Sequence, residues 1–268
     1  MPIRRIMLML VLACMLLASR PAAAITNGQL DGQRHPYVVG LFYAEAGQLG
    51  FLCSGTLIAP DVVLTAAHCT EVLEGDGITT LVTNDTALSQ STRFITGTPI
   101  TNPGYELNKA HPTHGDIGVI LLDQPIMLAE YGVLPEAGLL DALATKRGQQ
   151  RQDVTFVGYG VQGRAEPSGG GRPPYAIDFK RHTATGVILN LRSALTDGEN
   201  VQVSTNPGQD RGGICYGDSG GPVLLGDSNV VVGINSFVLA PDCTGVAFAY
   251  RTDTAAAREF LAPYVTLP

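Results

Sequence analysis

Apolar runs rich in β-branched and aromatic residues recur along this chain and are separated by turn residues. Runs of about four to eight such residues, bounded by glycine, proline, asparagine or aspartate, predict β-strands. The runs lie at residues 37–43, 51–58, 62–65, 78–82, 92–100, 117–122, 153–157, 175–187, 201–203, 223–225, 230–236 and 246–250. Residues 47–50, between the first two runs, predict a hairpin. Helical periodicity is scarce, so the pattern predicts an all-β protein with many turns.

The strands fall into two groups, joined by residues 125–148, where the alternation stops. This stretch contains Pro135 and glycines and ends in polar residues, which is typical of a connection between domains. Residues 253–261 end the chain with a short helical pattern, for which Asp253 or Thr254 is the expected N-cap. The sequence therefore predicts two β-domains followed by a short helix.

The first 24 residues have the pattern of a secretory signal peptide. Arg4 and Arg5 precede an apolar run at 6–18, and small residues follow at Ala22–Ala24. A run of about 13 apolar residues is shorter than the ~20 that span a bilayer. Cys14 weakly suggests a bacterial lipobox, but apolar residues continue beyond it. We expect cleavage near Ala24 and a secreted mature protein without a membrane anchor.

Charge and length restrict the partners. The chain has 268 residues, enough for one large or two small domains, and 17 basic residues against 24 acidic ones. Removal of residues 1–24 leaves 14 basic and 24 acidic residues, a net charge of −10. Nucleic acids and anionic membranes bind basic faces, so neither is an expected partner.

Cleavage would also remove Cys14, which leaves four of the five cysteines: Cys53, Cys69, Cys215 and Cys243. An even number in an exported protein predicts two disulfides, and four cysteines allow three pairings. A zinc site is the alternative. It is disfavoured because no two of these cysteines form a C-x-x-C pair.

Residues Gly217–Pro222 (GDSGGP) place a serine among glycines. Such a turn exposes the Ser219 hydroxyl and lets backbone N–H groups converge on one point. The same letters fit the G-x-S-x-G nucleophile elbow of α/β-hydrolases, in which the catalytic histidine follows the serine. All five histidines here precede Ser219, which argues against that elbow, whereas the order His, Asp, Ser remains open.

Two further motifs supply the partners of such a serine. His68 lies in Ala66–Cys69 (AAHC), and Asp116 stands at the head of a buried run. A neutral imidazole can take the proton of the attacking hydroxyl, and a buried carboxylate can fix the imidazole tautomer and balance its charge. The N–H groups of Gly217 and Ser219 would bind the oxyanion.

Together these motifs resemble the chymotrypsin/trypsin-type serine endopeptidases. The resemblance covers nearly the whole mature chain, because Ile25–Gly28 (ITNG) is similar to the family's Ile-Val-Gly-Gly and 233–237 (GINSF) to its Gly-Ile-Val-Ser-Trp. It implies one peptidase domain, 25–268, made of two antiparallel six-stranded β-barrels with the site in the cleft between them. The expected bounds are about 25–134 for the N-terminal barrel, about 149–252 for the C-terminal barrel and 253–262 for the helix.

The resemblance also implies roles for residues outside the triad. Asp218 would pair with the free ammonium of Ile25, so the site would depend on a cut before Ile25. Because Ile25 directly follows Ala24, signal peptidase itself is expected to make this N-terminus, and a separate zymogen is the alternative. The expected disulfides are Cys53–Cys69 and Cys215–Cys243.

Four residues bear on substrate choice. Trypsin-like members carry an acid six residues before the serine, where this chain has Gly213, and Val238 stands where open pockets carry glycine. Ser236 to Val238 would pair with extended substrate, with Phe237 in place of the usual tryptophan. Small or medium apolar residues are therefore expected before the scissile bond, rather than Arg or Lys.

The expected partners are polypeptide substrates and protein protease inhibitors, and the protein is expected to be a monomer without cofactor or metal. The acidic stretch 71–77 lacks the residue spacing of calcium loops, so a solvated loop is the preferred interpretation. Two disulfides alone suggest a pared-down bacterial member. The alternative function is a catalytically silent homologue that acts as a binding module.

Overall fold

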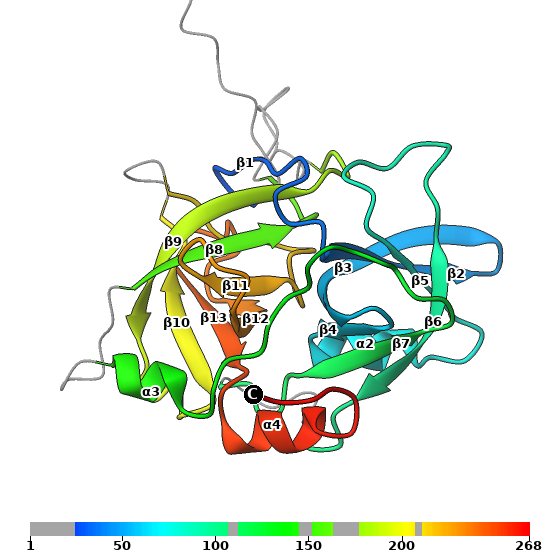
Figure 1. The fold of residues 1–268 in the computed structure, drawn as a ribbon. Helices are drawn as coiled ribbons and strands as arrows, with labels where there is room; N and C mark the ends of the chain where they lie inside the picture. The colour runs from blue at the N-terminus through cyan, green and yellow to red at the C-terminus, as the bar shows by residue number, and fades with distance from the viewer. Residues whose placement is uncertain (1–24, 107–111, 145–151, 163–176, 207–210) are drawn as a thin grey trace, which may run out of the picture.

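The computed structural model describes residues 25–106, 112–144, 152–162, 177–206 and 211–268. Most of their regular structure is antiparallel β-sheet, arranged as two barrels side by side (Figure 1). The expected signal segment lies outside the described residues. Among those residues, no helix is long and apolar enough to cross a membrane. The predicted fold class, two antiparallel six-stranded barrels, is confirmed.

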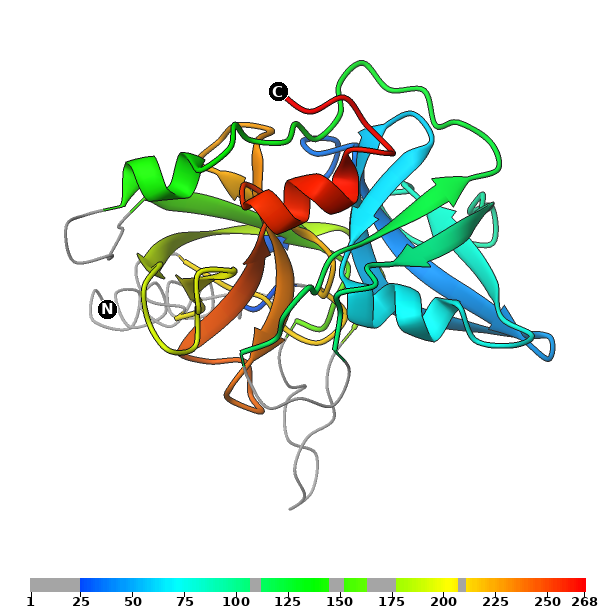
Figure 2. The same ribbon diagram turned by 90° about the horizontal axis from the view of Figure 1, so that it is seen from below.

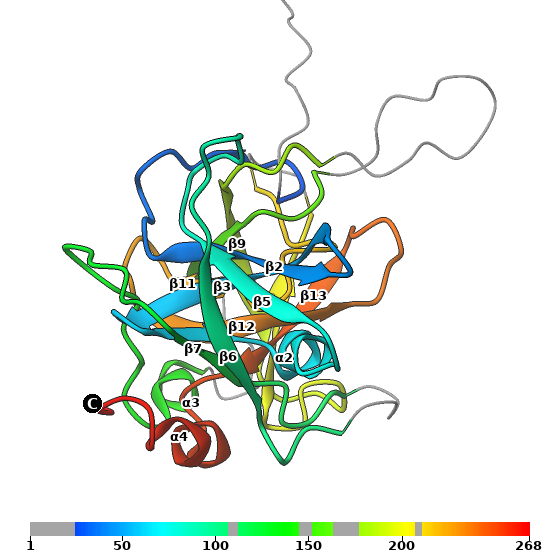
Figure 3. The same ribbon diagram turned by 90° about the vertical axis from the view of Figure 1, so that its right-hand side faces the viewer.

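The first barrel is closed, with strand order β2-β3-β4-β7-β6-β5 and a final pairing of β5 with β2. Its strands are β2 (Val38–Glu45), β3 (Gln48–Ala59), β4 (Val62–Thr65), β5 (Thr79–Thr83), β6 (Ile95–Thr101) and β7 (Gly118–Leu122). Helix α2 (Ala67–Leu73) follows β4 directly and lies beside the barrel, as Figure 3 shows. The sequence pattern did not predict this helix.

The hairpin between β2 and β3 turns earlier than predicted. Ala46 and Gly47 both have positive φ, 47° and 80°, and form the two-residue loop that matches the twist of antiparallel strands. Residues 48–50, expected in the turn, instead pair with β2, for example Gly50 with Tyr43. The strands are therefore longer than the apolar pattern indicates.

The second barrel has the order β9-β10-β13-β12-β11-β8 and closes through the pairing of β8 with β9. Its strands are β8 (Asp153–Gly158), β9 (His182–Asn190), β10 (Asn200–Ser204), β11 (Pro222–Leu225), β12 (Val231–Val238) and β13 (Val246–Arg251). The connection between the barrels contains a short helix, α3 (Leu139–Leu143). Residues 175 and 176 of the predicted strand lie outside the described residues, and Phe179 has a φ of 54°, which an extended strand does not allow, so β9 begins at His182.

The two ends of the described chain cross over. Strand β1 (Gln29–Leu30) pairs with β9, so residues 25–30 lie on the second barrel, although the first barrel was expected to start at 25. Helix α4 (Ala255–Leu261) has Thr254 as its N-cap and contributes Ala257 and Leu261 to a hydrophobic cluster that contains residues of both barrels. Figure 2 shows α4 lying where the barrels meet.

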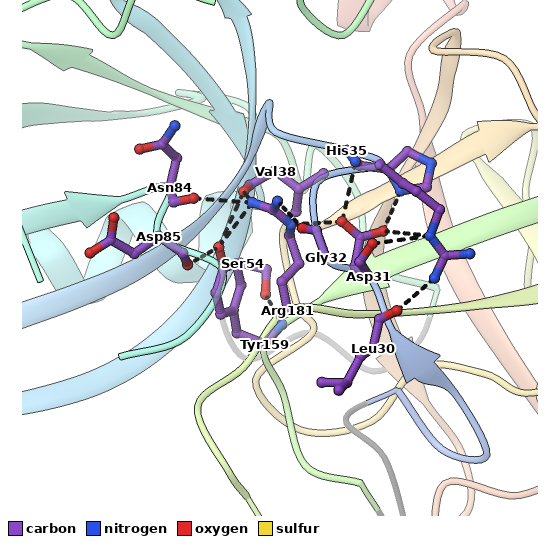
Figure 4. A network of polar contacts seen from close by, with 11 residues as sticks. Leu30, Asp31, Gly32, His35, Val38, Ser54, Asn84, Asp85, Tyr159 and Arg181 are labelled. Carbon is purple, nitrogen blue, oxygen red and sulfur yellow. Dashed lines mark hydrogen bonds and ion pairs between the residues drawn. The ribbon is translucent and has the colours of Figure 1, made fainter. Parts of the chain in front are cut away.

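A buried arginine ties the N-terminal segment to both barrels (Figure 4). Arg181 is fully buried and donates from Nε to the Asp31 carboxylate at 2.9 Å. Its guanidinium also donates to the carbonyls of Gly32, Val38 and Asn84, at 2.8, 3.0 and 3.2 Å. Val38 begins a strand of the first barrel and Arg181 precedes a strand of the second, so this cluster fixes their relative position.

Arg181→Met is expected to lower the free energy of unfolding by about 3–5 kcal/mol, because Asp31 would remain buried without its cation. Burial opposes ionisation, yet His35 and Arg181 together hold the pKa of Asp31 below its ordinary value. Adding Asp31→Asn to the variant should reduce the loss, since the amide needs no cation. Denaturant unfolding measures both changes, and a loss below about 1 kcal/mol for Arg181→Met would contradict the role given to this pair.

Candidate active site

His68 and Asp116 meet at one end of the first barrel. Asp116 is fully buried just before β7, and His68 lies in the first turn of α2. His68 Nδ1 is 3.0 Å from Asp116 Oδ2 and 3.1 Å from Oδ1, and the backbone N–H of His68 donates to Oδ1 at 3.0 Å. The carboxylate therefore fixes both the imidazole ring and the start of the helix that carries it.

The environment of this pair favours opposite charges on its members. Burial alone would raise the pKa of Asp116, but the charge and hydrogen bonds of His68, with the hydroxyl of Ser236, hold it below its ordinary value. Burial alone would lower the pKa of His68, but Asp116 outweighs that effect and raises it. An ionised Asp116 keeps the proton of a neutral His68 on Nδ1 and leaves Nε2 free to accept another.

The Ser219 turn is held between the two barrels. The Ser219 carbonyl accepts from the backbone N–H of Ser54 on β3 at 2.8 Å, and the Gly220 N–H donates to the Asn235 carbonyl on β12 at 2.8 Å. A Cβ at Gly220 would lie 2.0 Å from Thr65 Oγ1, so only glycine allows the turn to approach the end of β4. The turn thus lies against the strand that leads into the His68 helix.

Ser219 itself is half-buried, and its hydroxyl makes no hydrogen bond to His68 within the described structure. The N–H groups of Gly217 and Ser219 also have no acceptor among the described residues. Neighbouring N–H groups do have acceptors. The Asp218 N–H donates to the Cys215 carbonyl, and the Gly221 N–H donates to the Asp218 carbonyl. Two unused donors on either side of Asp218 are suited to bind an oxygen that arrives with a substrate.

Asp218 is a fully buried carboxylate. It accepts hydrogen bonds from the backbone N–H groups of Gly160 and Cys215, both at 2.9 Å, and it contacts no basic side chain among the described residues. Burial raises its pKa to about 7, because the two backbone donors only partly offset the loss of water. Ile25 is fully buried in the core of the same barrel, and Thr26 pairs with Gly213.

The expected substrate-binding residues lie along β12 and beside it. Phe237 stacks on Phe248, with ring centroids 4.6 Å apart and planes 8° from parallel. Val238 packs against the second barrel's core and the Cys215–Cys243 disulfide. A Cβ at Gly213 would lie 2.4 Å from the Cβ of Thr205, so the site has no room for a side chain at residue 213.

The structure contains the expected disulfides. Cys53–Cys69 joins β3 to α2 beside His68, and Cys215–Cys243 anchors the entry to the Ser219 turn. Cys53, His68 and Cys69 are the described residues whose metal-type ligand atoms lie close together, but the disulfide occupies both sulfurs. In the acidic stretch 71–77, Glu74 accepts a hydrogen bond from the Thr101 N–H. Residues 71–73 of this stretch, which was expected to be a solvated loop, belong instead to α2.

Sequence reasoning missed two polar residues that contact the Ser219 turn. Ser54 and Asn235 are fully buried, and each binds a carbonyl of the turn through its side chain. The sequence signal for Asn235 was a polar residue within an apolar stretch, inside the motif at 233–237.

Comparison with known proteins gives concordant results. The family model described as Trypsin matches residues 26–257. Brachyurin from Leptuca pugilator is 29% identical over 220 residues, which cover 78% of this chain and 83% of the relative. Trypsin from Saccharopolyspora erythraea is 29% identical over 213 residues, covering 76% and 82%. The solved structure of HL collagenase has a TM-score of 0.65 at 19% identity, covering 89% of this chain and 97% of that one.

Proposed function

Because this chain belongs to the trypsin family of serine endopeptidases, we propose that it is a secreted enzyme that cleaves polypeptides through an acyl-enzyme on Ser219. The observation that carries the proposal is the buried Asp116 carboxylate on His68 Nδ1, in a fold that holds the Ser219 turn beside the His68 helix. The signal peptide would direct export and be removed by cleavage near Ala24.

In this mechanism His68 Nε2 takes the proton of Ser219 as Oγ attacks the carbonyl carbon of the scissile bond. The resulting oxyanion accepts hydrogen bonds from the N–H groups of Gly217 and Ser219. The protonated His68, stabilised by Asp116, then donates its proton to the leaving amine. A water molecule, activated by His68 in the same way, hydrolyses the ester and releases Ser219.

Maturation supplies the cation that Asp218 lacks. A cut before Ile25 would create an ammonium group on a residue that is buried in the same barrel as Asp218. Pairing would offset the cost of burying this carboxylate, because a buried charge is tolerated when it is paired and hydrogen-bonded. N-terminal sequencing of the secreted protein tests this step. Inactive material that starts upstream of Ile25 would instead indicate a separate zymogen.

Labelling with a fluorophosphonate tests the central proposal, since this reagent reacts with an activated serine. The mature protein should be labelled, and Ser219→Ala should abolish the label while leaving thermal unfolding unchanged. A folded protein without Ser219-dependent labelling would favour the catalytically silent binding module.

The activity is expected to decline in acid with a midpoint above the ordinary histidine pKa of about 6.5. His68 must be neutral to accept a proton, and its raised pKa means that it becomes protonated at a higher pH than free histidine. The pH profile of kcat/KM measures this midpoint. Glu71 contributes to the shift by its charge, so Glu71→Gln should move the midpoint down. A midpoint at or below about 6.5 in the unmodified enzyme would contradict this assignment.

Peptide anilides that carry Ala or Val before the scissile bond are expected to be cleaved faster than those with Phe or Arg. In the proposed pocket, Gly213 would offer no charge to a basic side chain, and Val238 would narrow the entrance. Val238→Gly should raise the relative rate for Phe by roughly tenfold. The panel measures kcat/KM for all four substrates, and a preference for Arg would overturn the proposed pocket.

A further inference from the structure

Three successive carbonyl groups of the Ser219 turn each accept a hydrogen bond from Ser54 or Asn235. Ser54 Oγ donates to the Gly217 carbonyl at 3.0 Å, and Asn235 Nδ2 donates to the Asp218 carbonyl at 3.1 Å. The backbone N–H of Ser54 donates to the Ser219 carbonyl. The side chains of Ser54, from the first barrel, and Asn235, from the second, therefore bind the peptide groups on the two sides of Asp218.

Asn235 is an unusual residue for its position. It is fully buried in β12 next to Ile234, and its Oδ1 has no hydrogen-bond partner within the described residues. Burying a polar atom without a partner is unfavourable, and an aliphatic residue would avoid that cost. Among the described residues, Asn235 Nδ2 donates to the Asp218 carbonyl, which also accepts from the Gly221 N–H at 3.0 Å.

The direction of the Ser54 bond is fixed by its surroundings. The backbone N–H of Tyr159 donates to Ser54 Oγ at 3.0 Å, a contact visible in Figure 4. A serine hydroxyl has one proton to donate, and here that proton is left for the Gly217 carbonyl. Ser54 is fully buried, so water does not compete for the bond.

We propose that Asn235, together with Ser54, is a positioning residue that aims the oxyanion donors of the turn. In a planar peptide the C=O and the following N–H point in opposite directions. When Asn235 holds the Asp218 carbonyl on one side, the Ser219 N–H is turned to the other side, where the oxyanion would form. The inference rests on the proposed catalytic function of Ser219.

Ser54 holds the peptide that links the two donors, the one between Gly217 and Asp218. Gly217 has no Cβ and a φ of 89°, so its flanking peptide planes rotate easily unless outside contacts hold them. The Val161 N–H donates to the Tyr216 carbonyl at 2.8 Å, which orients the peptide that carries the Gly217 N–H. Ser54 holds the peptide plane on the other side of Gly217. With both planes held, the donor pair keeps one geometry.

The test compares Asn235→Val with Asn229→Val in the mature enzyme. Asn229 is the matched control, because its Nδ2 donates to the Tyr131 carbonyl at 3.0 Å, outside the Ser219 turn. Asn235→Val should lower kcat by roughly 10- to 100-fold with KM nearly unchanged, since a misaimed donor fails mainly in the transition state. The affinity for a peptide aldehyde with a valine side chain, whose adduct with Ser219 places an oxygen in the same position, should fall by the same factor.

Equal behaviour of the two variants, or a loss of kcat without a parallel loss of aldehyde affinity, would overturn the role of Asn235. If Asn235→Val does not fold, Ser54→Ala carries the test, because it removes one hydroxyl and keeps the backbone bond to Ser219. It should lower kcat and aldehyde affinity together by roughly three- to tenfold. Unmodified protein that lacks Ser219-dependent fluorophosphonate labelling would refute the proposed function itself, and this inference with it.

Discussion

Replacing His68 with alanine is expected to lower kcat/KM about 10⁶-fold, and adding Ser219→Ala should change the rate by less than about tenfold more. The two groups act as one unit, because the Ser219 hydroxyl is a poor nucleophile without a base and the base has no other task. The residual rate would come from the oxyanion donors and substrate binding alone.

This expectation is measured with a peptide anilide that carries Ala or Val before the scissile bond. His114→Ala is the matched control, because His114 also lies near carboxylates, 3.7 Å from Asp197 and 3.5 Å from Glu199, but takes no part in the mechanism. It should change kcat/KM by less than about threefold. A His68→Ala variant that keeps more than about 1% of the activity would show that His68 is not the base.

Asp218→Asn is expected to lower the activity of the mature enzyme and to stabilise its precursor. In the mature enzyme it should lower kcat/KM roughly 10²- to 10³-fold, because the Ile25 ammonium would be buried without its carboxylate. In a precursor with an uncleaved extension before Ile25, it should raise the free energy of unfolding at pH 8.

The sign in the precursor follows from the pKa of Asp218, which burial raises to about 7. The folded chain then binds this proton more tightly than the unfolded chain, so stability falls as the pH rises from about 4 to about 7. An asparagine has no charge to bury and removes that decrease. Denaturant unfolding at pH 5 and pH 8 measures the effect, with the exposed Asp227→Asn as a control. A precursor that Asp218→Asn destabilises at pH 8 would contradict this account.

The barrel architecture and the family predicted from the sequence motifs are confirmed, and the catalytic roles of His68, Asp116 and Ser219 stay predictions. His68 lies on the helix α2, which the sequence pattern did not predict. A helix of seven residues is too short to show a period in the sequence. The hairpin turn was misplaced for a similar reason, since Ala46 is not a typical residue for a positive φ.

The sequence also did not predict the contacts of Ser54 and Asn235, for a different reason. Their function depends on which carbonyl groups lie within 3.1 Å in the folded chain, and no local pattern contains that information. Residues 25–30 were assigned to the first barrel because they precede it in sequence. Their pairing with β9 is a long-range contact that only the assembled fold determines.

The crossed ends of the chain determine when this protein can fold. The hydrophobic cluster that contains Ala257 and Leu261 of α4 draws residues from both barrels, so part of its apolar surface stays open until α4 is available. In the export that we propose, the chain emerges from its N-terminus onward, and that helix crosses last. The cluster shared by the two barrels is then incomplete during passage, and we expect its packing to be completed only after α4 has crossed. The enzyme would become active only outside the cell, where it cannot cleave the unfolded polypeptides of the cytoplasm.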